Sequence, residues 1–380
     1  MILSGMPSSR ERLLKVLRGE MPDRVPVSTY ELVGWNSRAW ENSEPSYRRL
    51  MDAIRDKTDC VAMWGDWSPA GLGGFAYTWA EGVPVTEESW ADGPRTVTRT
   101  VVRTPAGDLA MVRAADPAVH TTWTTEHVCK DAGDVAKVLS IPYQYSPPSF
   151  ADLPRIRAEV GEKGIIMSSI ADPLCVAAEL FSMQDYLLFA FTERPLFRRI
   201  LDAMLPRVMD HLSAHLEASA ADLYRICGPE YATPPYLPPA MFREFVVPYV
   251  VEMIRLIHSH GKHARLHCHG RIAANLDAIV ETGADAIDPA EPPPDGDIIL
   301  AEIKSRAPSL AVFGNIELKL LERGTEEDVR RAVRTAVEEG KPGGRFCLMP
   351  TAAPIDVDLA SGTERNYIVM IETALETGGY

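Results

Sequence analysis

Two histidines separated by a single residue, His267 and His269, are the side chains of this sequence with the clearest chemical potential. They lie in the short run 263–269, which predicts a strand. Residues i and i+2 of a strand point to the same face, so both imidazoles can reach one ion while Cys268 points away. With one carboxylate added, the pair matches a catalytic zinc site that keeps a position open. The same alternation aims Arg265 inward, so we expect this strand to carry a bulge or to end early.

Acidic residues follow the neighbouring predicted strands and could complete such a site. The candidate metal ligands are His267, His269, Glu291 and Glu317. Glu230 and Tyr231 follow another strand and are the catalytic candidates, with Glu230 as an acid or base near a leaving group. The alternative interpretation is structural: the glutamates are solvated helix caps, and the histidines only form hydrogen bonds in a polar barrel mouth.

The tryptophans are concentrated in the first part of the chain, because all seven lie at or before Trp123. They provide either ordinary core packing or a flat aromatic wall for a ring-bearing ligand. Some of them follow the first two predicted strands, and polar residues follow the last two. The substrate-binding candidates are Trp35, Trp64, Asp66, Trp67, Asn315 and Thr351.

A strand-then-helix alternation positions these residues. The runs predicted as strands are 25–30, 60–65, 165–170, 221–227, 263–269, 284–289, 310–315 and 345–350. Alternation of this length implies parallel strands, and eight of them predict an α/β fold, a (β/α)8 TIM barrel. In such a barrel the active site lies at the carboxyl ends of the strands, where the candidate residues stand.

Helices are predicted between the strands. The strongest pattern covers 240–260, where apolar residues follow i, i+3, i+4 spacing and Gly261 comes just after the end. Ser8 and Glu11 form a capping box that predicts a helix at 8–18 instead of a leader segment. The other predicted helices cover 271–282, 297–307 and 325–339.

One stretch interrupts this alternation. Residues 94–126 alternate threonine and valine around a Pro-Ala-Gly-Asp turn, which is typical of antiparallel strands. We therefore predict a single TIM-barrel domain over 1–380, with antiparallel strands at 90–127 inserted after the second strand.

Composition limits the classes of partner. The chain has 380 residues, 39 Lys and Arg, 53 Asp and Glu, and a formal net charge of −14. This acidity argues against nucleic acid and against an anionic membrane as partners. Six scattered cysteines without a CxxC motif, together with the absence of a long apolar run, predict a cytoplasmic protein without disulfides. The oligomeric state stays open, a homodimer included.

Several segments, in order along residues 10 to 378, resemble the uroporphyrinogen decarboxylase superfamily. They are RERLLKVLRGEMPDRVPV, PPAMFREFVVPYVVEMIRLIHSHGKHARLHCHG, TGADAIDP and FGNIE. The resemblance implies a (β/α)8 barrel and one of two chemistries. One is metal-free decarboxylation of uroporphyrinogen, and the other is zinc-dependent methyl transfer involving a corrinoid protein.

Departures from the family patterns bear on which chemistry applies. The decarboxylases carry an arginine-rich segment after the first strand that grips substrate carboxylates, whereas this chain has STYELVGWNS there. The methyltransferases hold zinc with His-x-Cys on the fifth strand and a cysteine after the eighth. His267 matches that histidine, but His269 and Thr351 stand where the cysteines are expected. A site of imidazole and carboxylate is harder than one of thiolates and favours an oxygen-bearing substrate.

The resemblance therefore implies a zinc-dependent methyltransferase or O-demethylase that takes a methyl group from a small, aromatic methoxylated donor. An N-methyl donor is a variant of this hypothesis. The acceptor is a corrinoid on a partner protein, because this sequence has no Asp-x-His-x-x-Gly motif. The alternatives are a uroporphyrinogen decarboxylase-like decarboxylase and a non-catalytic small-molecule-binding barrel. A hydrolase of the amidohydrolase type is disfavoured, because those enzymes carry HxH on the first strand.

Overall fold

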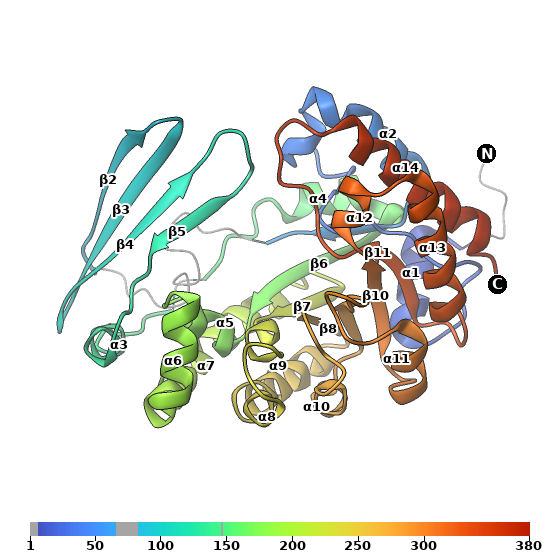
Figure 1. Ribbon diagram of the computed structural model, residues 1–380. Coiled ribbons are helices and arrows are strands. Elements are labelled where there is room, and N and C mark those ends of the chain that lie inside the picture. The colour runs from blue at the N-terminus through green and yellow to red at the C-terminus, as the bar shows by residue number, and fades with distance from the viewer. Residues whose placement is uncertain (1–6, 66–82, 146) are drawn as a thin grey trace.

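Parallel strands surrounded by helices form the larger part of the molecule, and an antiparallel sheet stands beside them (Figure 1). The computed structural model describes residues 7–65, 83–145 and 147–380. The parallel strands pair in chain order in a curved seven-stranded sheet. They are β1 (Cys60–Met63), β6 (Gly164–Ala171), β7 (Leu223–Cys227), β8 (His263–Cys268), β9 (Ala286–Pro289), β10 (Ala311–Ile316) and β11 (Phe346–Pro350).

The segment around Val27 joins the two edges of this sheet. Val27 forms a parallel bridge with Leu348 of β11, and its carbonyl accepts from the backbone N–H of Asp59, which precedes β1, at 2.7 Å. The fold is therefore TIM-barrel-like. The strand predicted at 25–30 is reduced to this bridge, because Pro26 has no N–H to donate and the chain turns at Tyr30, whose φ is 56°.

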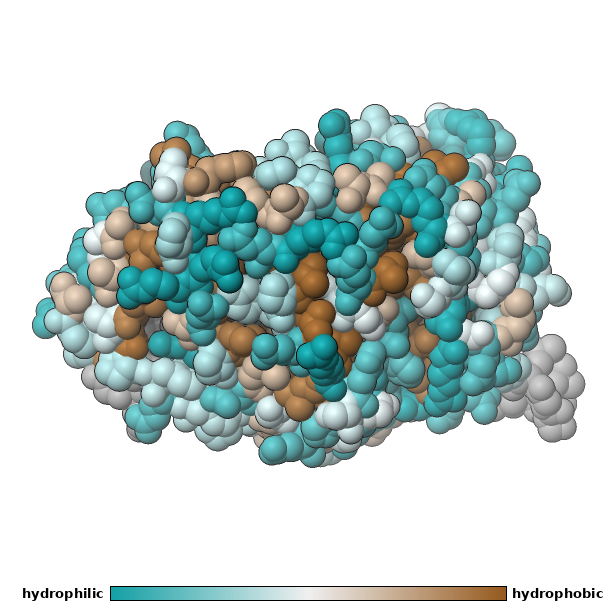
Figure 2. Space-filling model, turned by 90° about the horizontal axis from the view of Figure 1, so that it is seen from below, coloured by the Kyte–Doolittle hydropathy of each residue, from teal (hydrophilic) through white to brown (hydrophobic). Residues whose placement is uncertain are grey.

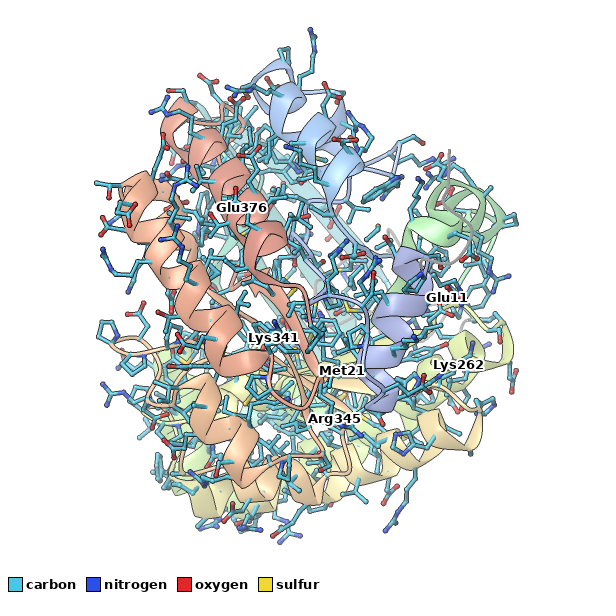
Figure 3. The ribbon with its side chains drawn as sticks, turned by 90° about the vertical axis from the view of Figure 1, so that its right-hand side faces the viewer. Glu11, Met21, Lys262, Lys341, Arg345 and Glu376 are labelled. Carbon is cyan, nitrogen blue, oxygen red and sulfur yellow. The ribbon has the colours of Figure 1, made fainter. Side chains whose placement is uncertain are left out.

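Helix α1 (Ser9–Arg18) covers the amino ends of the strands. The capping box of Ser8 and Glu11 is present at its start, as predicted. One buried cluster joins the helix to the interior of the sheet and includes Leu13, Val16, Leu17, Ile165 and Leu223. Figure 3 shows this side of the molecule, with Met21 just after α1 beside Arg345, which precedes β11. Because this end is closed, a ligand has to approach from the opposite end of the strands.

The remaining helices pack around the parallel strands. They are α2 (Arg48–Lys57), α3 (Ala132–Leu139), α4 (Leu153–Val160), α5 (Pro173–Ala178), α6 (Met183–Thr192), α7 (Arg194–Glu217), α8 (Pro239–Phe245), α9 (Val247–Ser259), α10 (Leu276–Glu281), α11 (Leu300–Arg306), α12 (Leu318–Arg323), α13 (Glu326–Gly340) and α14 (Ser361–Thr377). The single helix predicted at 240–260 is wrong in one respect, because the chain breaks between α8 and α9. Pro248 has no N–H for the carbonyl of Glu244, and its ring crowds that turn.

The antiparallel sheet lies between β1 and β6 in the sequence. It consists of β2 (Val85–Asp92), β3 (Arg95–Thr104), β4 (Gly107–Ala115) and β5 (Thr122–Glu126), paired in that order. Val102, Leu109 and Met111 are buried on one of its faces and belong to the main hydrophobic core. The predicted insertion is therefore present, although its first strand begins before residue 90.

Asp59 connects α1 to the junction of β1 with the Val27 segment. Its fully buried carboxylate accepts from Arg12 at 2.7 Å, from Arg24 at 2.8 Å and from the backbone N–H of Val27 at 3.0 Å. We expect Asp59→Ala to lower the free energy of unfolding by about 3–5 kcal/mol, because it removes the buried carboxylate that Arg12 and Arg24 share, even though Arg12 still pairs with Asp23. Urea denaturation measures this loss. Asp52→Ala, which breaks an exposed pair with Arg55, is the control and should cost less than about 1 kcal/mol.

The face of the molecule seen in Figure 2 is mostly polar. In the face shown in Figure 2, hydrophilic side chains dominate and apolar residues occur in separate groups. Among the described residues, no helix is both long enough and apolar enough to span a lipid bilayer.

Candidate active site

His267 and His269 stand together at the carboxyl end of β8. Their ring centroids are 4.5 Å apart and their planes are perpendicular. Strand β8 pairs with β9 in an unbroken register that sets His267 opposite Asp288. The bulge that we expected is wrong, but the strand predicted at 263–269 does end one residue early, at Cys268. Arg265 faces the interior, where Asp288 is its partner at 3.0 Å.

A carboxylate engages the same ring nitrogen of each histidine. Nδ1 of His267 lies 3.0 Å from Asp288, and Nδ1 of His269 lies 2.7 Å from Glu291. An ionised carboxylate can only accept, so each Nδ1 carries a proton and the lone pair of a neutral ring lies on Nε2. Histidines that bind metals are commonly oriented in this way by a carboxylate behind the ring. Each of the two histidines, which are two positions apart in the chain, therefore keeps Nε2 as the nitrogen that can bind a metal.

The two imidazoles differ in basicity. Burial lowers the pKa of His267 to about 3, so this ring is neutral at physiological pH. Burial is the largest influence on the pKa of His269 and acts to lower it. The hydrogen bond with Glu291 and the negative charges of Glu291, Asp288 and Glu230 together outweigh burial, so the pKa is raised. Glu291 shows the converse: burial opposes ionisation, while the hydrogen bond with His269 holds its pKa below the usual value.

The position of Glu291 revises its predicted role as a metal ligand. Its Oε1 accepts from His269, and its Oε2 accepts from the backbone N–H of Gly270 at 2.6 Å. Both oxygens are thus engaged by the end of β8. Glu291 orients His269 in this structure, and spacing in the sequence could not distinguish this role from direct ligation.

Glu317 and Thr351 follow β10 and β11. The hydroxyl of Thr351 lies 3.4 Å from Oε2 of Glu317, and the other oxygen of Glu317 is buried without a hydrogen-bond partner. Burial, reinforced by the charge of Glu291, raises the pKa of Glu317 to about 7. Within the described ranges, no three His, Cys, Asp or Glu side chains are gathered as a ready metal-binding group. The two histidines and Glu317 therefore offer donors without forming a complete ligand set.

The raised pKa of Glu317 predicts a pH-dependent stability. Since the folded state holds this proton more tightly than the unfolded state, stability is greatest below the ordinary pKa of 4.5 and falls as the pH rises through about 7. We expect the Tm of the wild type to fall more than that of Glu317→Gln between about pH 5 and about pH 8. Differential scanning calorimetry measures both. Glu302→Gln on the exposed side of α11 is the matched control, and a Glu317→Gln profile identical to wild type would contradict the prediction.

Beneath the histidines lies a charged cluster that the sequence did not reveal as a site. It contains Tyr30, Arg225, Arg265, His267 and Asp288, all of them buried. Asp288 contacts both His267 and Arg265, and Arg225 donates to the hydroxyl of Tyr30 at 2.5 Å. The signal available in the sequence was the i, i+2 alternation, which places Arg225 and Arg265 at matching positions of β7 and β8.

Glu230 and Tyr231 lie in the turn after β7, at Pro229–Ala232. Oε2 of Glu230 accepts from the backbone N–H of Gly228 at 2.8 Å, and burial raises the pKa of Glu230. The electrostatic influence of Glu230 on His269 places the two close together. The ring of Tyr231 packs edge-on against Tyr186, and burial raises its pKa too. Glu230 is thus a carboxyl group biased toward its protonated form beside the histidines.

The other substrate candidates are dispersed. Trp64 is buried among the outer core residues, where its indole N–H donates to Asp152 at 3.3 Å, so it does not line the mouth. Trp35 is half-buried against the same core. Asn315 is buried on β10, the strand next to β11. Asp66 and Trp67 lie outside the described residues.

Comparisons with known proteins agree with this fold. A methyltransferase from Methanosarcina mazei superposes with a TM-score of 0.62 at 17% sequence identity, covering 97% of this chain and 99% of that one. A D-psicose 3-epimerase from Clostridium cellulolyticum H10 gives a TM-score of 0.36 at 10% identity, covering 60% of this chain and 84% of that one. No curated protein sequence matches significantly. The family model of uroporphyrinogen decarboxylase (URO-D) matches residues 109–353, most of the chain, and the protein therefore belongs to the uroporphyrinogen decarboxylase family.

Proposed function

We propose that this protein is a metal-dependent methyltransferase that removes a methyl group from a small methoxylated donor. The observation that carries the proposal is the contact of each Nδ1 with a carboxylate, which leaves Nε2 of His267 and Nε2 of His269 as the atoms that can bind a metal. The similarity in fold to a methyltransferase is consistent with this function, although at 17% identity it supports the fold alone.

The donor chemistry fits zinc. Two imidazole nitrogens supply half of a tetrahedral set, and Glu317 has a buried oxygen without a partner that a cation would satisfy. A position left open by these ligands would be available to the substrate oxygen, as in other catalytic zinc sites. When bound, the metal supplies Lewis acidity to the oxygen from which the methyl group departs.

The residues of the chain then have separate tasks. Glu291 and Asp288 hold the two imidazoles in position. Glu230, whose raised pKa favours its protonated form, supplies a proton to the leaving oxygen near His269. Trp35 contributes one side of the pocket for an aromatic donor.

The methyl acceptor is a corrinoid carried by a partner protein. Removal of a methyl group from an ether oxygen requires a strongly nucleophilic acceptor, which a cofactor supplies. The sequence contains no Asp-x-His-x-x-Gly motif with which it could bind a corrinoid itself. This part of the proposal follows the methyltransferase branch that the sequence resembles.

Elemental analysis of the purified protein tests the metal requirement, and a demethylation assay tests the reaction. We expect about one zinc per chain after loading, retained through gel filtration. Methoxylated aromatic compounds should lose their methyl groups only when a reduced corrinoid protein is supplied, and a chelator should stop the reaction. A protein that binds no metal under these conditions contradicts the proposal and favours metal-free decarboxylation. A metal-loaded protein without turnover favours a binding role.

A further inference from the structure

The floor beneath the histidines carries an uncompensated positive charge. Arg225 and Arg265 both project into it, and the carboxylate at their level is that of Asp288. His267 contacts that same carboxylate through Nδ1, and Tyr30 contributes a hydroxyl group that accepts from Arg225. Two guanidinium groups therefore face one buried carboxylate, inside a protein whose formal net charge is −14.

Asp288 lies closer to Arg265 than to Arg225. Its Oδ1 lies 3.0 Å from Nε of Arg265, whereas its Oδ2 lies 3.7 Å from Nε of Arg225 and is already engaged by His267. The structure gives Nε of Arg225 no hydrogen-bond partner. Among the described residues, the hydrogen bond of the Arg225 guanidinium is to a neutral group, the hydroxyl of Tyr30.

Glu31 does not supply the missing charge. Its Oε1 lies 3.8 Å from Nη1 of Arg225, beyond hydrogen-bond distance, and 46% of its side chain is exposed, so solvent screens the pair. A buried guanidinium in this situation requires an anionic partner with good hydrogen-bond geometry.

Access to this cation comes from the histidine side. The side chain of His269 is 36% exposed to solvent. The exposed fraction is 7% for the side chain of His267, 6% for that of Arg225 and 0% for that of Asp288. Exposure thus falls steadily from the histidines to the floor. A ligand that reaches the Nε2 atoms of the histidines meets Arg225 and Tyr30 next, before the sealed pair of Arg265 and Asp288.

We propose that Arg225, together with Tyr30, binds a carboxylate group of the substrate and makes the protein selective for anionic donors. A carboxylate matches the planar fork of the guanidinium, which can donate two parallel hydrogen bonds to it. Because the hydroxyl of Tyr30 accepts from Arg225, its own proton points elsewhere and is available to the same anion. Insofar as that anion is the methyl donor, the inference rests on the proposed function.

Isothermal titration calorimetry with matched acids and amides tests this selectivity. The pairs are benzoate with benzamide, 4-methoxybenzoate with 4-methoxybenzamide, and propionate with propionamide, which have nearly the same shape and differ in charge. Chelator-treated protein is used, so that a carboxylate cannot bind through a metal. We expect at least one acid to bind about tenfold or more tightly than its amide. Equal affinities within every pair, or no binding of any acid, would overturn the proposal.

Variants identify the cation responsible. Arg225→Met should abolish the preference for the acid, and Arg225→Lys, which keeps the charge without the fork, should retain part of it. Glu31→Gln should tighten acid binding, because it removes a competing negative charge. Arg207→Met replaces another buried arginine, on α7, and is the matched control that should keep the preference. A preference that persists in folded Arg225→Met contradicts the proposal, and the acid-to-amide ratio of the wild type decides the case if that variant does not fold.

The result is separable from the fate of the proposed function. Selective binding of acids without any methyl transfer would support the anion site and contradict the proposed methyltransferase function. If methyl transfer from 4-methoxybenzamide is as efficient as from 4-methoxybenzoate, the methyltransferase function is supported and the anion site is contradicted.

Discussion

Simultaneous replacement of His267 and His269 by alanine is expected to eliminate metal binding and to reduce methyl transfer by about a thousandfold or more, because a metal Lewis acid contributes several kcal/mol to transition-state stabilisation. The two Nε2 atoms are the donors that the structure orients best, and Glu317 alone cannot hold the ion. Metal content and the initial rate of demethylation measure the two effects on the same preparation.

His258→Ala is the matched control for this experiment. His258 also contacts a carboxylate, Asp285 at 2.9 Å, but it lies on the exposed surface of α9. Its loss should change neither metal content nor rate. If the double variant keeps a stoichiometric metal and wild-type activity, the His267 and His269 site is not the catalytic centre.

The Asp288→Ala variant is expected to lose about 3–5 kcal/mol of unfolding free energy, because it leaves Arg265 as a buried cation without a counter-ion. It should also release His267 from its fixed orientation and so weaken metal binding. Chemical denaturation followed by circular dichroism measures the first effect, and zinc titration measures the second. Asp297→Ala changes an exposed carboxylate that accepts from the backbone N–H of Ala273, and it should cost much less.

Acid should reduce the stability difference between wild type and Asp288→Asn. Burial alone would raise the pKa of Asp288, but the charges of Arg265 and Arg225 and the hydrogen bond with His267 hold it well below its usual value. The stabilisation by the ionised group is therefore complete above the unfolded-state pKa of about 4 and is lost as the pH falls below that value. A stability difference that stays constant down to the acid-unfolding limit would contradict this assignment.

The strand order and the position of the histidines were predictable, because both follow from local patterns. Alternating short apolar runs and helical periodicity give a parallel sheet, and the carboxyl end of β8 necessarily carries His267 and His269. The break between α8 and α9 was also readable in principle from Pro248. The roles of the acidic residues were not: whether Glu291 binds a metal or orients His269 depends on which atoms its two oxygens reach in the fold.

The charged floor shows a second limit of sequence patterns. Arg265 looked incompatible with a regular inward-facing strand, since isolated buried guanidinium groups are costly. Its partner, Asp288, comes from the next strand and only becomes adjacent through the register of β8 with β9. Tyr30 and Arg225 meet in the same way from opposite parts of the chain, so no local pattern could have paired them.

The bridge between Val27 and Leu348 also determines when this protein can fold. The two residues are roughly three hundred positions apart, so the pairing is of very high contact order and slow to form. During synthesis, the side of the Val27 segment that pairs with Leu348 stays unpaired until the ribosome has delivered β11, and such an edge readily recruits other chains. We therefore infer that a nascent chain stalled before β11 is prone to aggregation, and that arrival of this last strand commits the molecule to its native state.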